Sequence, residues 1–263
     1  MCGIVGYVGQ RPAHEVVMDA LRRMEYRGYD SAGIALVDAD GRRTVRRRAG
    51  RLANLEQAVA EMAASSEASL AGTTGIGHTR WATHGRPTDR NAHPHRDAAG
   101  RIAVVHNGII ENFAALRQEL EAAGVEFSSD TDTEVTVHLV AQAYRHGDTA
   151  GDFVASVLSV LRRLEGHFTL VFASADAPGT IVAARRSTPL VLGIGDGEMF
   201  VGSDVAAFIP HTRQAVELGQ DQAVVLTAHD YRITDFDGND DAANAREFRI
   251  DWDLAAAEKG GYE

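Results

Sequence analysis

Apolar residues recur at helical spacing in four segments of the chain. Positions three and four residues apart predict helices over 14–25, 110–122, 132–145 and 151–164. Thr131, just before the third helix, and Glu134, in its first turn, have the spacing of a capping box, in which two side chains satisfy free backbone N–H groups. This spacing predicts a well-defined start for that helix.

Short apolar runs bounded by turn residues predict strands elsewhere. They lie at 33–38, 102–106, 168–173, 180–184, 189–194, 198–202, 223–227 and 231–235. The opening CGIVGYVG is typical of one more buried strand. Beyond residue 166 the connections are short, which implies antiparallel pairing. Because the predicted helices lie within the first 165 residues, the fold class is expected to be α+β, with helices packed on antiparallel sheets.

Composition narrows the class of protein. The chain has 263 residues, of which 44% are hydrophobic, so it can bury a large core. The segment MCGIVGYVG does not have the form of a signal peptide. A single cysteine cannot form an internal disulfide, so we expect a cytoplasmic protein. The net charge of −11 argues against nucleic acid as a main partner. No apolar run approaches the ~20 residues needed to span a membrane, so no membrane is expected as a partner.

Charge also varies along the chain. The arginines between residues 42 and 51 are interpreted as the solvated face of a hairpin, with an anion or partner patch as the alternative. The acidic, turn-rich segment 235–245 suggests the end of a compact unit. We therefore expect one domain over 1–245 and the start of a linker over 246–263.

The second residue is the only cysteine. Removal of Met1 leaves Cys2 with both a thiol and a free α-amine, whose ordinary pKa is near 8. Such an amine can take the thiol proton as the sulfur attacks and pass it to a leaving group. The alternative is that Cys2 is a small buried hydrophobic residue.

Polar residues concentrate in a few motifs within apolar surroundings: GIGHTRWATHG (75–85), NAHPH (91–95), VVHNGIIEN (104–112) and SDTDTEV (129–135). The histidines in these motifs are His78, His84, His93, His95 and His106. Their spacing does not match common zinc sites, so neither a metal nor another cofactor is expected. His93 and His106 are interpreted as residues that orient loops.

The motifs MCGIVG, HTRWATHG, NAHPH and HNGIIEN closely resemble those of class II glutamine amidotransferases, which have an N-terminal nucleophile. With EYRGYDSAG and RSTPLVLGIG, the chain is most similar to glutaminase domains of glutamine–fructose-6-phosphate aminotransferases. The resemblance implies a four-layer αββα sandwich of two antiparallel sheets. It also implies hydrolysis of L-glutamine, with ammonia passed to sugar-isomerase domains that convert fructose 6-phosphate to glucosamine 6-phosphate in a homodimeric full-length enzyme.

The resemblance also assigns roles to residues. Cys2 corresponds to the nucleophile, and Asn107 and Gly108 correspond to the oxyanion hole; the alternative for Asn-Gly is a type I′ hairpin turn. Arg80 and Asp132 correspond to the residues that bind the α-carboxylate and α-ammonium of glutamine. Asp132 is also placed to stabilise a helix N-terminus.

Three further residues follow from the same motif. Thr83 and His84 correspond to substrate contacts, and Trp81 corresponds to a tryptophan that covers the site; the alternative for Trp81 is a core anchor. Two other functions stay open at this point. One is a glutaminase that supplies another synthetase, and the other is a non-catalytic glutamine-binding regulator if Met1 is retained.

Overall fold

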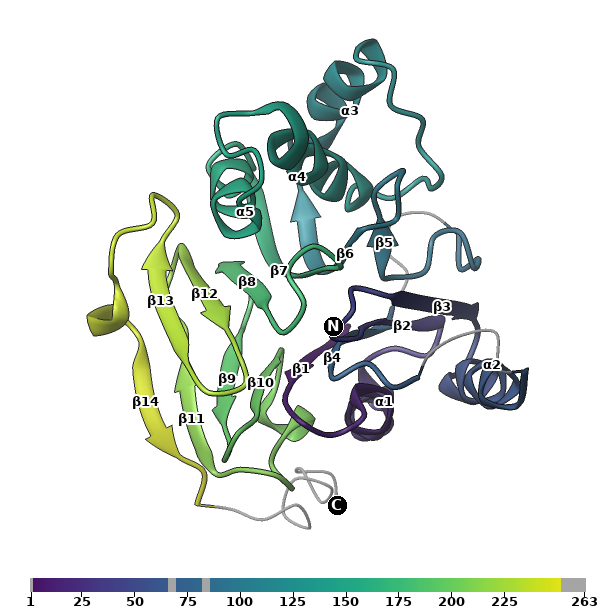
Figure 1. Cartoon of the computed structure of the whole chain (residues 1–263), viewed down its shortest axis with the longest axis vertical. Coiled ribbons are helices and arrows are strands. Elements are labelled where there is room, and N and C mark those ends of the chain that lie inside the picture. Colours follow the sequence, from purple (N-terminus) through teal and green to yellow (C-terminus); the bar gives the residue numbers. More distant parts are fainter. Residues whose placement is uncertain (1, 66–69, 82–85, 252–263) are drawn as a thin grey trace.

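Two antiparallel sheets face one another in the computed structural model, which describes residues 2–65, 70–81 and 86–251 (Figure 1). The first sheet has eight strands, in the spatial order β14 (Arg246–Arg249), β11 (Gln214–Glu217), β9 (Val191–Ile194), β10 (Met199–Gly202), β1 (Gly3–Val8), β4 (Thr74–Arg80), β2 (Ser31–Val37) and β3 (Arg43–Ala49). The second has six, in the order β13 (Tyr231–Asp235), β12 (Gln222–Leu226), β8 (Ile181–Arg186), β7 (Gly166–Ser174), β6 (Ile102–Ile110) and β5 (His95–Arg96).

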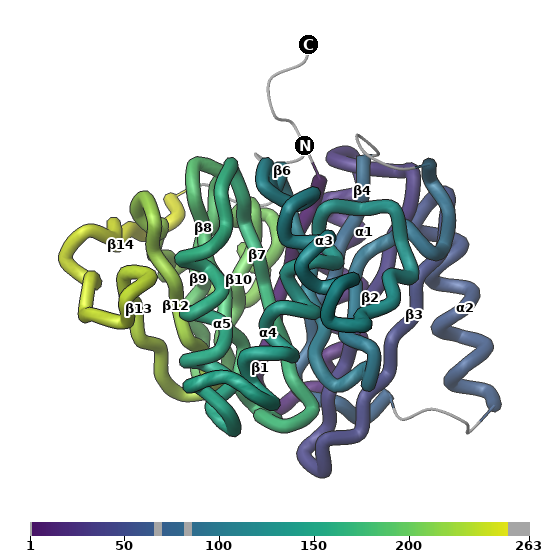
Figure 2. The backbone as a smooth tube through the Cα atoms, turned by 90° about the horizontal axis from the view of Figure 1, so that it is seen from above, coloured from purple at the N-terminus to yellow at the C-terminus, as the bar shows by residue number. Residues whose placement is uncertain are grey.

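Helices cover the two outer faces, as Figures 1 and 2 show. On the eight-stranded sheet lie α1 (Ala13–Arg23) and α2 (Leu52–Ser65). On the six-stranded sheet lie α3 (Phe113–Ala122), α4 (Glu134–His146) and α5 (Phe153–Leu161). The expected α+β fold, a four-layer αββα sandwich, is therefore confirmed.

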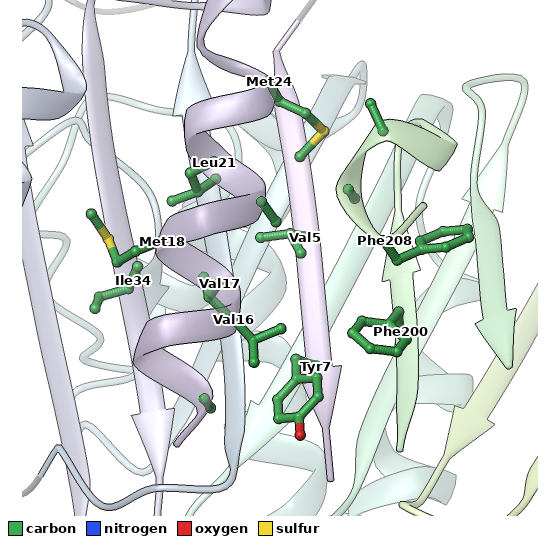
Figure 3. Close-up of a cluster of buried hydrophobic side chains, with 14 of the residues drawn as sticks. Val5, Tyr7, Val16, Val17, Met18, Leu21, Met24, Ile34, Phe200 and Phe208 are labelled. Atoms are coloured by element: carbon green, nitrogen blue, oxygen red, sulfur yellow. The ribbon is translucent and has the colours of Figure 1, made fainter. Parts of the chain in front are cut away.

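Strand β1 shows how alternation builds two cores at once. Ile4 and Val8 point into the layer between the sheets, while Val5 and Tyr7 pack beneath α1 (Figure 3). Successive side chains of a strand face opposite sides, and each fully buried aliphatic side chain contributes about 1.5–3 kcal/mol. A central strand of this kind is held from both sides, and this fixes the position of Cys2, which immediately precedes it.

Several elements differ from the sequence-based expectation. The four predicted helices and the strands predicted with them are present, with ends shifted by a few residues. Four strands of the structure, β4, β5, β11 and β14, were not predicted, and neither was most of α2. The hairpin interpretation of Asn107-Gly108 is wrong, because both residues pair with β7 inside β6, which continues to Ile110.

The C-terminal part of the sheet extends past residue 245. Strand β14 pairs with β11 on residues 246–249, and Ile250 packs in the core under α1. Residues 252–263, most of the segment expected to be a linker, lie outside the described residues. Among the helices that the structure describes, none has the length and apolar character needed to cross a membrane.

Candidate active site

The site forms where β1 and β4 of one sheet meet β6 of the other. In the register of β1 with β4, Gly3 lies opposite Thr79, which brings Cys2 next to the end of β4. A cavity of about 280 Å³ opens here. Six of the eight expected site residues line it: Cys2, Arg80, Trp81, Asn107, Gly108 and Asp132. The other two, Thr83 and His84, lie outside the described residues.

The Cys2 sulfur is held by the backbone of Trp81. The Trp81 N–H donates to Sγ over 3.1 Å. Burial raises the pKa of the Cys2 thiol, while the Trp81 hydrogen bond and the nearby Arg80 act in the opposite direction. The resting sulfur is therefore a thiol that needs a base, with one donor already placed to stabilise the thiolate. Met1 lies outside the described residues, so the role of the Cys2 α-amine stays a prediction.

Asn107 and Gly108, on the opposite sheet, line the same cavity as Cys2. The Asn107 side-chain Nδ2 donates to the Cys2 carbonyl oxygen over 2.9 Å. Gly108 has a φ of +117°, and a Cβ at this position would lie 1.9 Å from the His167 carbonyl oxygen. Only glycine fits this backbone, so β6 departs from regular strand geometry at the cavity wall.

Two opposite charges lie in the same cavity. Arg80 ends β4 and is almost fully buried, and burial lowers the pKa of its guanidinium, which nevertheless stays charged at neutral pH. Asp132 accepts the Ile110 N–H over 2.8 Å, which anchors one carboxylate oxygen to the end of β6. A fixed cation and a fixed anion in one small cavity suit a zwitterionic amino acid.

Behind the cavity four imidazoles pack together, and all are buried: His78, His93, His95 and His106. The rings of His78 and His93 stack with centroids 4.3 Å apart. Burial lowers the pKa of His78 and of His95 to about 3, and it also lowers those of His93 and His106. These side chains are neutral at physiological pH. In the part of the chain that the structure describes, no group of three or more His, Cys, Asp or Glu residues is arranged to hold a metal ion.

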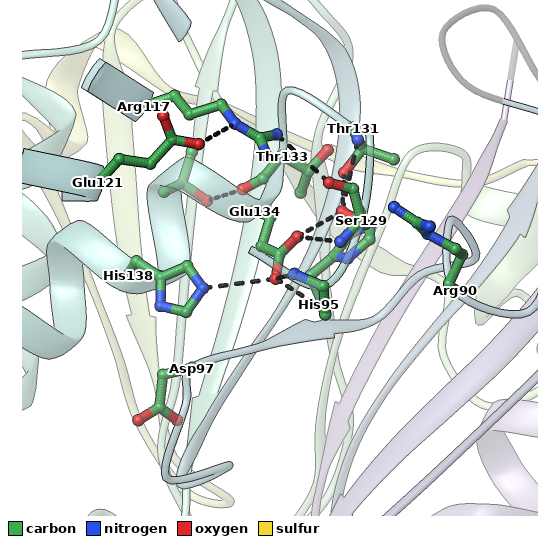
Figure 4. Close-up of polar contacts among 12 residues, drawn as sticks. Arg90, His95, Asp97, Arg117, Glu121, Ser129, Thr131, Thr133, Glu134 and His138 are labelled. Atoms are coloured by element: carbon green, nitrogen blue, oxygen red, sulfur yellow. Dashed lines mark hydrogen bonds and ion pairs between the residues drawn. The ribbon is translucent and has the colours of Figure 1, made fainter. Parts of the chain in front are cut away.

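His95 is linked through the hydroxyls of Thr131 and Ser129 to a carboxylate at the start of α4 (Figure 4). Glu134 accepts the backbone N–H groups of Ser128 and Ser129 over 2.8 and 2.7 Å, and His138 lies 3.4 Å away. Burial would raise the pKa of Glu134, but the hydrogen bonds from His138, Ser129 and Ser128 outweigh it and lower the pKa. Glu134 therefore stays ionised and fixes the loop that carries Asp132.

The capping-box expectation is corrected by the same contacts. Glu134 is the first residue of α4, and its carboxylate binds the preceding loop. The Thr131 hydroxyl pairs with Ser129 Oγ and with His95 Nε2, at 3.1 and 3.0 Å. The serine N–H and O–H groups compete successfully for Glu134 because they offer it several donors at once.

Trp81 lies at the rim of the cavity and not in the core, so the core-anchor alternative is wrong. Its side chain is 46% exposed. Its ring packs edge-on against Tyr29, with centroids 5.3 Å apart. Tyr29 thus supports the Trp81 ring, and Trp81 is the one of the two that lines the cavity.

Sequence reasoning missed other cavity residues, of which Ser203 is the most informative. Its Oγ accepts the Ile4 N–H over 3.0 Å, and its own N–H donates to the Ile4 carbonyl over 3.1 Å. These bonds hold β1 two residues after Cys2. The remaining lining residues are Arg27, His78, His93, His106, Ile109, Thr131, Thr133, Thr188 and Pro189. A polar serine directly after the predicted strand 198–202 was the available signal.

Comparison with known proteins agrees with this geometry. The family model described as "Glutamine amidotransferase domain" matches residues 78–210. The chain belongs to this family. Residues 78–210 contain five of the six described site residues, and Cys2 precedes them.

Curated relatives of this amidotransferase domain share one name. The chain is 82% identical over 265 residues to "Glutamine--fructose-6-phosphate aminotransferase [isomerizing]" of Mycolicibacterium paratuberculosis, a match that covers 100% of this chain and 42% of the relative. The protein of the same name from Streptomyces coelicolor is 57% identical over 262 residues, covering 100% of this chain and 41% of the relative. The chain thus spans about two fifths of the length of these relatives.

Solved structures share the fold of the amidotransferase domain. A glutamine phosphoribosylpyrophosphate amidotransferase from B. subtilis superimposes with a TM-score of 0.73 at 24% identity, over 91% of this chain and 50% of that one. A second structure, described as the allosteric regulatory enzyme of purine biosynthesis, also gives 0.73, at 25% identity over 89% of this chain and 49% of that one. The chain therefore shares its two-sheet fold with both structures.

Proposed function

We propose that this domain hydrolyses L-glutamine to L-glutamate and ammonia, with Cys2 as the nucleophile. One observation carries the proposal: a thiol, the amide donor of Asn107 and the opposite charges of Arg80 and Asp132 line a single small cavity. Arg80 would bind the α-carboxylate, and Asp132 would bind the α-ammonium. That arrangement leaves the side-chain amide of glutamine directed toward Cys2.

The chemistry then follows in two stages. The thiol proton passes to the α-amine of a Met1-free Cys2 as sulfur bonds to the amide carbon, and the carbonyl electron pair moves to oxygen. The Asn107 amide and the Gly108 N–H stabilise this oxyanion, and the amine returns the proton to the leaving ammonia. Water next attacks the γ-glutamyl thioester and releases glutamate, which restores the thiol.

The ammonia has a further use in the longer protein that we infer from the relatives. We place this domain as the ammonia-producing part of a cytoplasmic glutamine–fructose-6-phosphate aminotransferase. Sugar-isomerase domains would combine the ammonia with fructose 6-phosphate to give glucosamine 6-phosphate, in a homodimer. The 82% identity across the whole chain supports this assignment over a glutaminase that supplies another synthetase.

The decisive test is covalent labelling of Cys2 together with activity. Intact mass first establishes whether Met1 is removed. An electrophilic glutamine analogue should then add its mass to the Met1-free protein and not to Cys2→Ala, which should lose measurable glutaminase activity while its Tm stays close to that of the wild type. Full activity in Cys2→Ala would overturn the proposal. Binding of glutamine without turnover by the Met1-free protein would point to the regulatory alternative.

A further inference from the structure

His78 contacts the oxyanion side of the cavity through one nitrogen. Its Nε2 lies 3.0 Å from Asn107 Oδ1 and 3.0 Å from the His106 carbonyl oxygen. Both neighbours are carbonyl-type oxygens, which only accept hydrogen bonds. Nε2 therefore carries the proton, and His78 donates it to both oxygens.

The contact decides which way the Asn107 amide is turned. An asparagine amide has an oxygen that accepts and a nitrogen that donates, and the two ends have almost the same shape. With Oδ1 turned to His78, Nδ2 is left facing Cys2, where it donates to the carbonyl oxygen over 2.9 Å. The opposite orientation would place an oxygen where the reaction develops negative charge.

We propose that His78 is a positioning residue for glutamine hydrolysis, because it holds the Asn107 amide with its N–H₂ end toward the reacting carbonyl. This inference rests on the proposed function of the cavity. It assigns His78 a role distinct from metal binding and from base catalysis.

The surroundings of His78 suit a fixed neutral donor. The residue is 1% exposed, and β4 lies between β1 and β2, where His78 is paired with Ile4 and Gly33. Its ring is stacked on His93 with planes 16° apart. Because burial keeps the imidazole neutral, it has a single proton, which is committed to Nε2; Nδ1 has no hydrogen-bond partner among the described residues.

Two amide substitutions separate this role from general packing. Glutamine carries its amide nitrogen the same number of bonds from Cβ as His Nε2, whereas asparagine reaches only to the position of Nδ1. His78→Gln should therefore keep kcat within a few-fold of the wild type. His78→Asn should lose about 10–100-fold in kcat, somewhat less than the ~10²–10³-fold expected for removal of an oxyanion donor. KM for glutamine should change little in either variant, since Arg80 and Asp132 are untouched.

A double-mutant cycle tests whether the effect passes through Asn107. In an Asn107→Ala background, His78→Asn and His78→Gln should have the same kcat, because the amide that His78 orients is gone. His211→Asn is the matched control: this half-buried histidine stacks on Phe200, with ring centroids 5.1 Å apart, and does not line the cavity. It should lower Tm with kcat within a few-fold of the wild type.

A readout independent of activity keeps the proposal separate from the proposed function. The side-chain N–H₂ signals of Asn107, identified by their loss in Asn107→Ala, should shift in His78→Asn and stay close to wild type in His78→Gln. Unchanged signals in His78→Asn, or equal kcat values for His78→Asn and His78→Gln, would overturn the role of His78. A Met1-free wild type without glutaminase activity would overturn the proposed function, while the Asn107 signals would still decide the orientation of the amide.

Discussion

The two walls of the cavity are built in different ways. On the eight-stranded sheet, Cys2 and Arg80 lie at strand ends, and Trp81 beyond them is 46% exposed. Facing them, Asn107 on β6 is anchored by His78 of β4, and Asp132, in the loop before α4, is anchored by the Ile110 N–H. The reactive group is thus at an open rim, and the groups that meet developing charge are set in a buried polar frame.

This difference fits the demands of the chemistry. A nucleophile must be reached by substrate and water, so it belongs near the opening. Donors that stabilise an oxyanion are effective only if they need not reorganise, which favours side chains fixed by second partners. The comparison predicts that changes to the buried wall mainly affect kcat, and that changes to the charged substrate contacts mainly affect KM.

The largest effect is expected at Gly108. A Cβ there would lie 1.9 Å from the His167 carbonyl oxygen, so Gly108→Ala must displace β6 where it forms the oxyanion hole. We expect a loss of at least about 10²-fold in kcat, the scale of one oxyanion donor, together with a lower Tm. Steady-state kinetics and thermal unfolding measure both.

Gly124→Ala is the matched control for backbone strain. Gly124 has a φ of +83°, and a Cβ added there would have no atom within 4 Å among the described residues. Left-handed backbone alone costs roughly 1–2 kcal/mol for alanine, so stability should fall and kcat should not. Equal kcat values for the two alanine variants would mean that the shape of β6 at Gly108 is irrelevant to catalysis.

The next effect concerns substrate binding. Arg80→Lys replaces a planar fork with a point charge, and Asp132→Asn removes the partner of an ammonium. Each should raise KM for glutamine by roughly 10–100-fold, the value of a charge-assisted hydrogen bond, with a smaller change in kcat. Initial-rate measurements over a wide range of glutamine concentration separate the two parameters.

Arg90→Lys controls for the loss of an arginine fork elsewhere. Arg90 pairs with Asp130 over 2.8 Å in an exposed ion pair, close in sequence to the site but not among the residues that line the cavity. The KM of the Arg90→Lys variant for glutamine should stay at the wild-type value. If Arg80→Lys and Asp132→Asn behave like this control, both residues are structural only.

How far the sequence predicts the fold depends on the element. Helix α1 and strand β1 have clear apolar periodicity, so both are predictable. Strand β4 is not, because its residues TGIGHTR, apart from Ile76, are small or polar and are buried only because β1 and β2 flank them. Tertiary burial overrides local propensity there.

The site also has a part that the sequence predicts and a part that only the structure shows. Residues such as Cys2 and Asn107 were identified through motifs, but the 2.9 Å contact between them joins two sheets and is invisible in the sequence. The role of Glu134 was misjudged because the capping-box spacing does not reveal competing donors at Ser128 and Ser129. The assigned roles themselves stay predictions until the variants are measured.

The smallest effect concerns the buried histidines behind Asn107. It is a loss of stability of the folded protein as the pH falls. The folded-state pKa values of His78 and His95 are lowered from 6.5 to about 3, so the unfolded chain binds protons first as the pH falls. The contribution to stability is complete above pH 6.5 and declines from there toward pH 3. Each proton excluded from the folded state should lower the free energy of unfolding by about 1.4 kcal/mol per pH unit.

Urea unfolding between pH 7 and pH 5 measures this slope before most carboxylates titrate. His95→Gln removes one group that takes up a proton only in the unfolded chain. The free energy of unfolding should therefore fall less steeply with pH, by about 1.4 kcal/mol per pH unit, even if the variant is less stable than the wild type at pH 7. A slope in His95→Gln equal to that of the wild type would mean that the His95 imidazole accepts a proton in the folded protein. The wall behind Asn107 would then be as open to water as the rim around Cys2, and the contrast between the two walls would be lost.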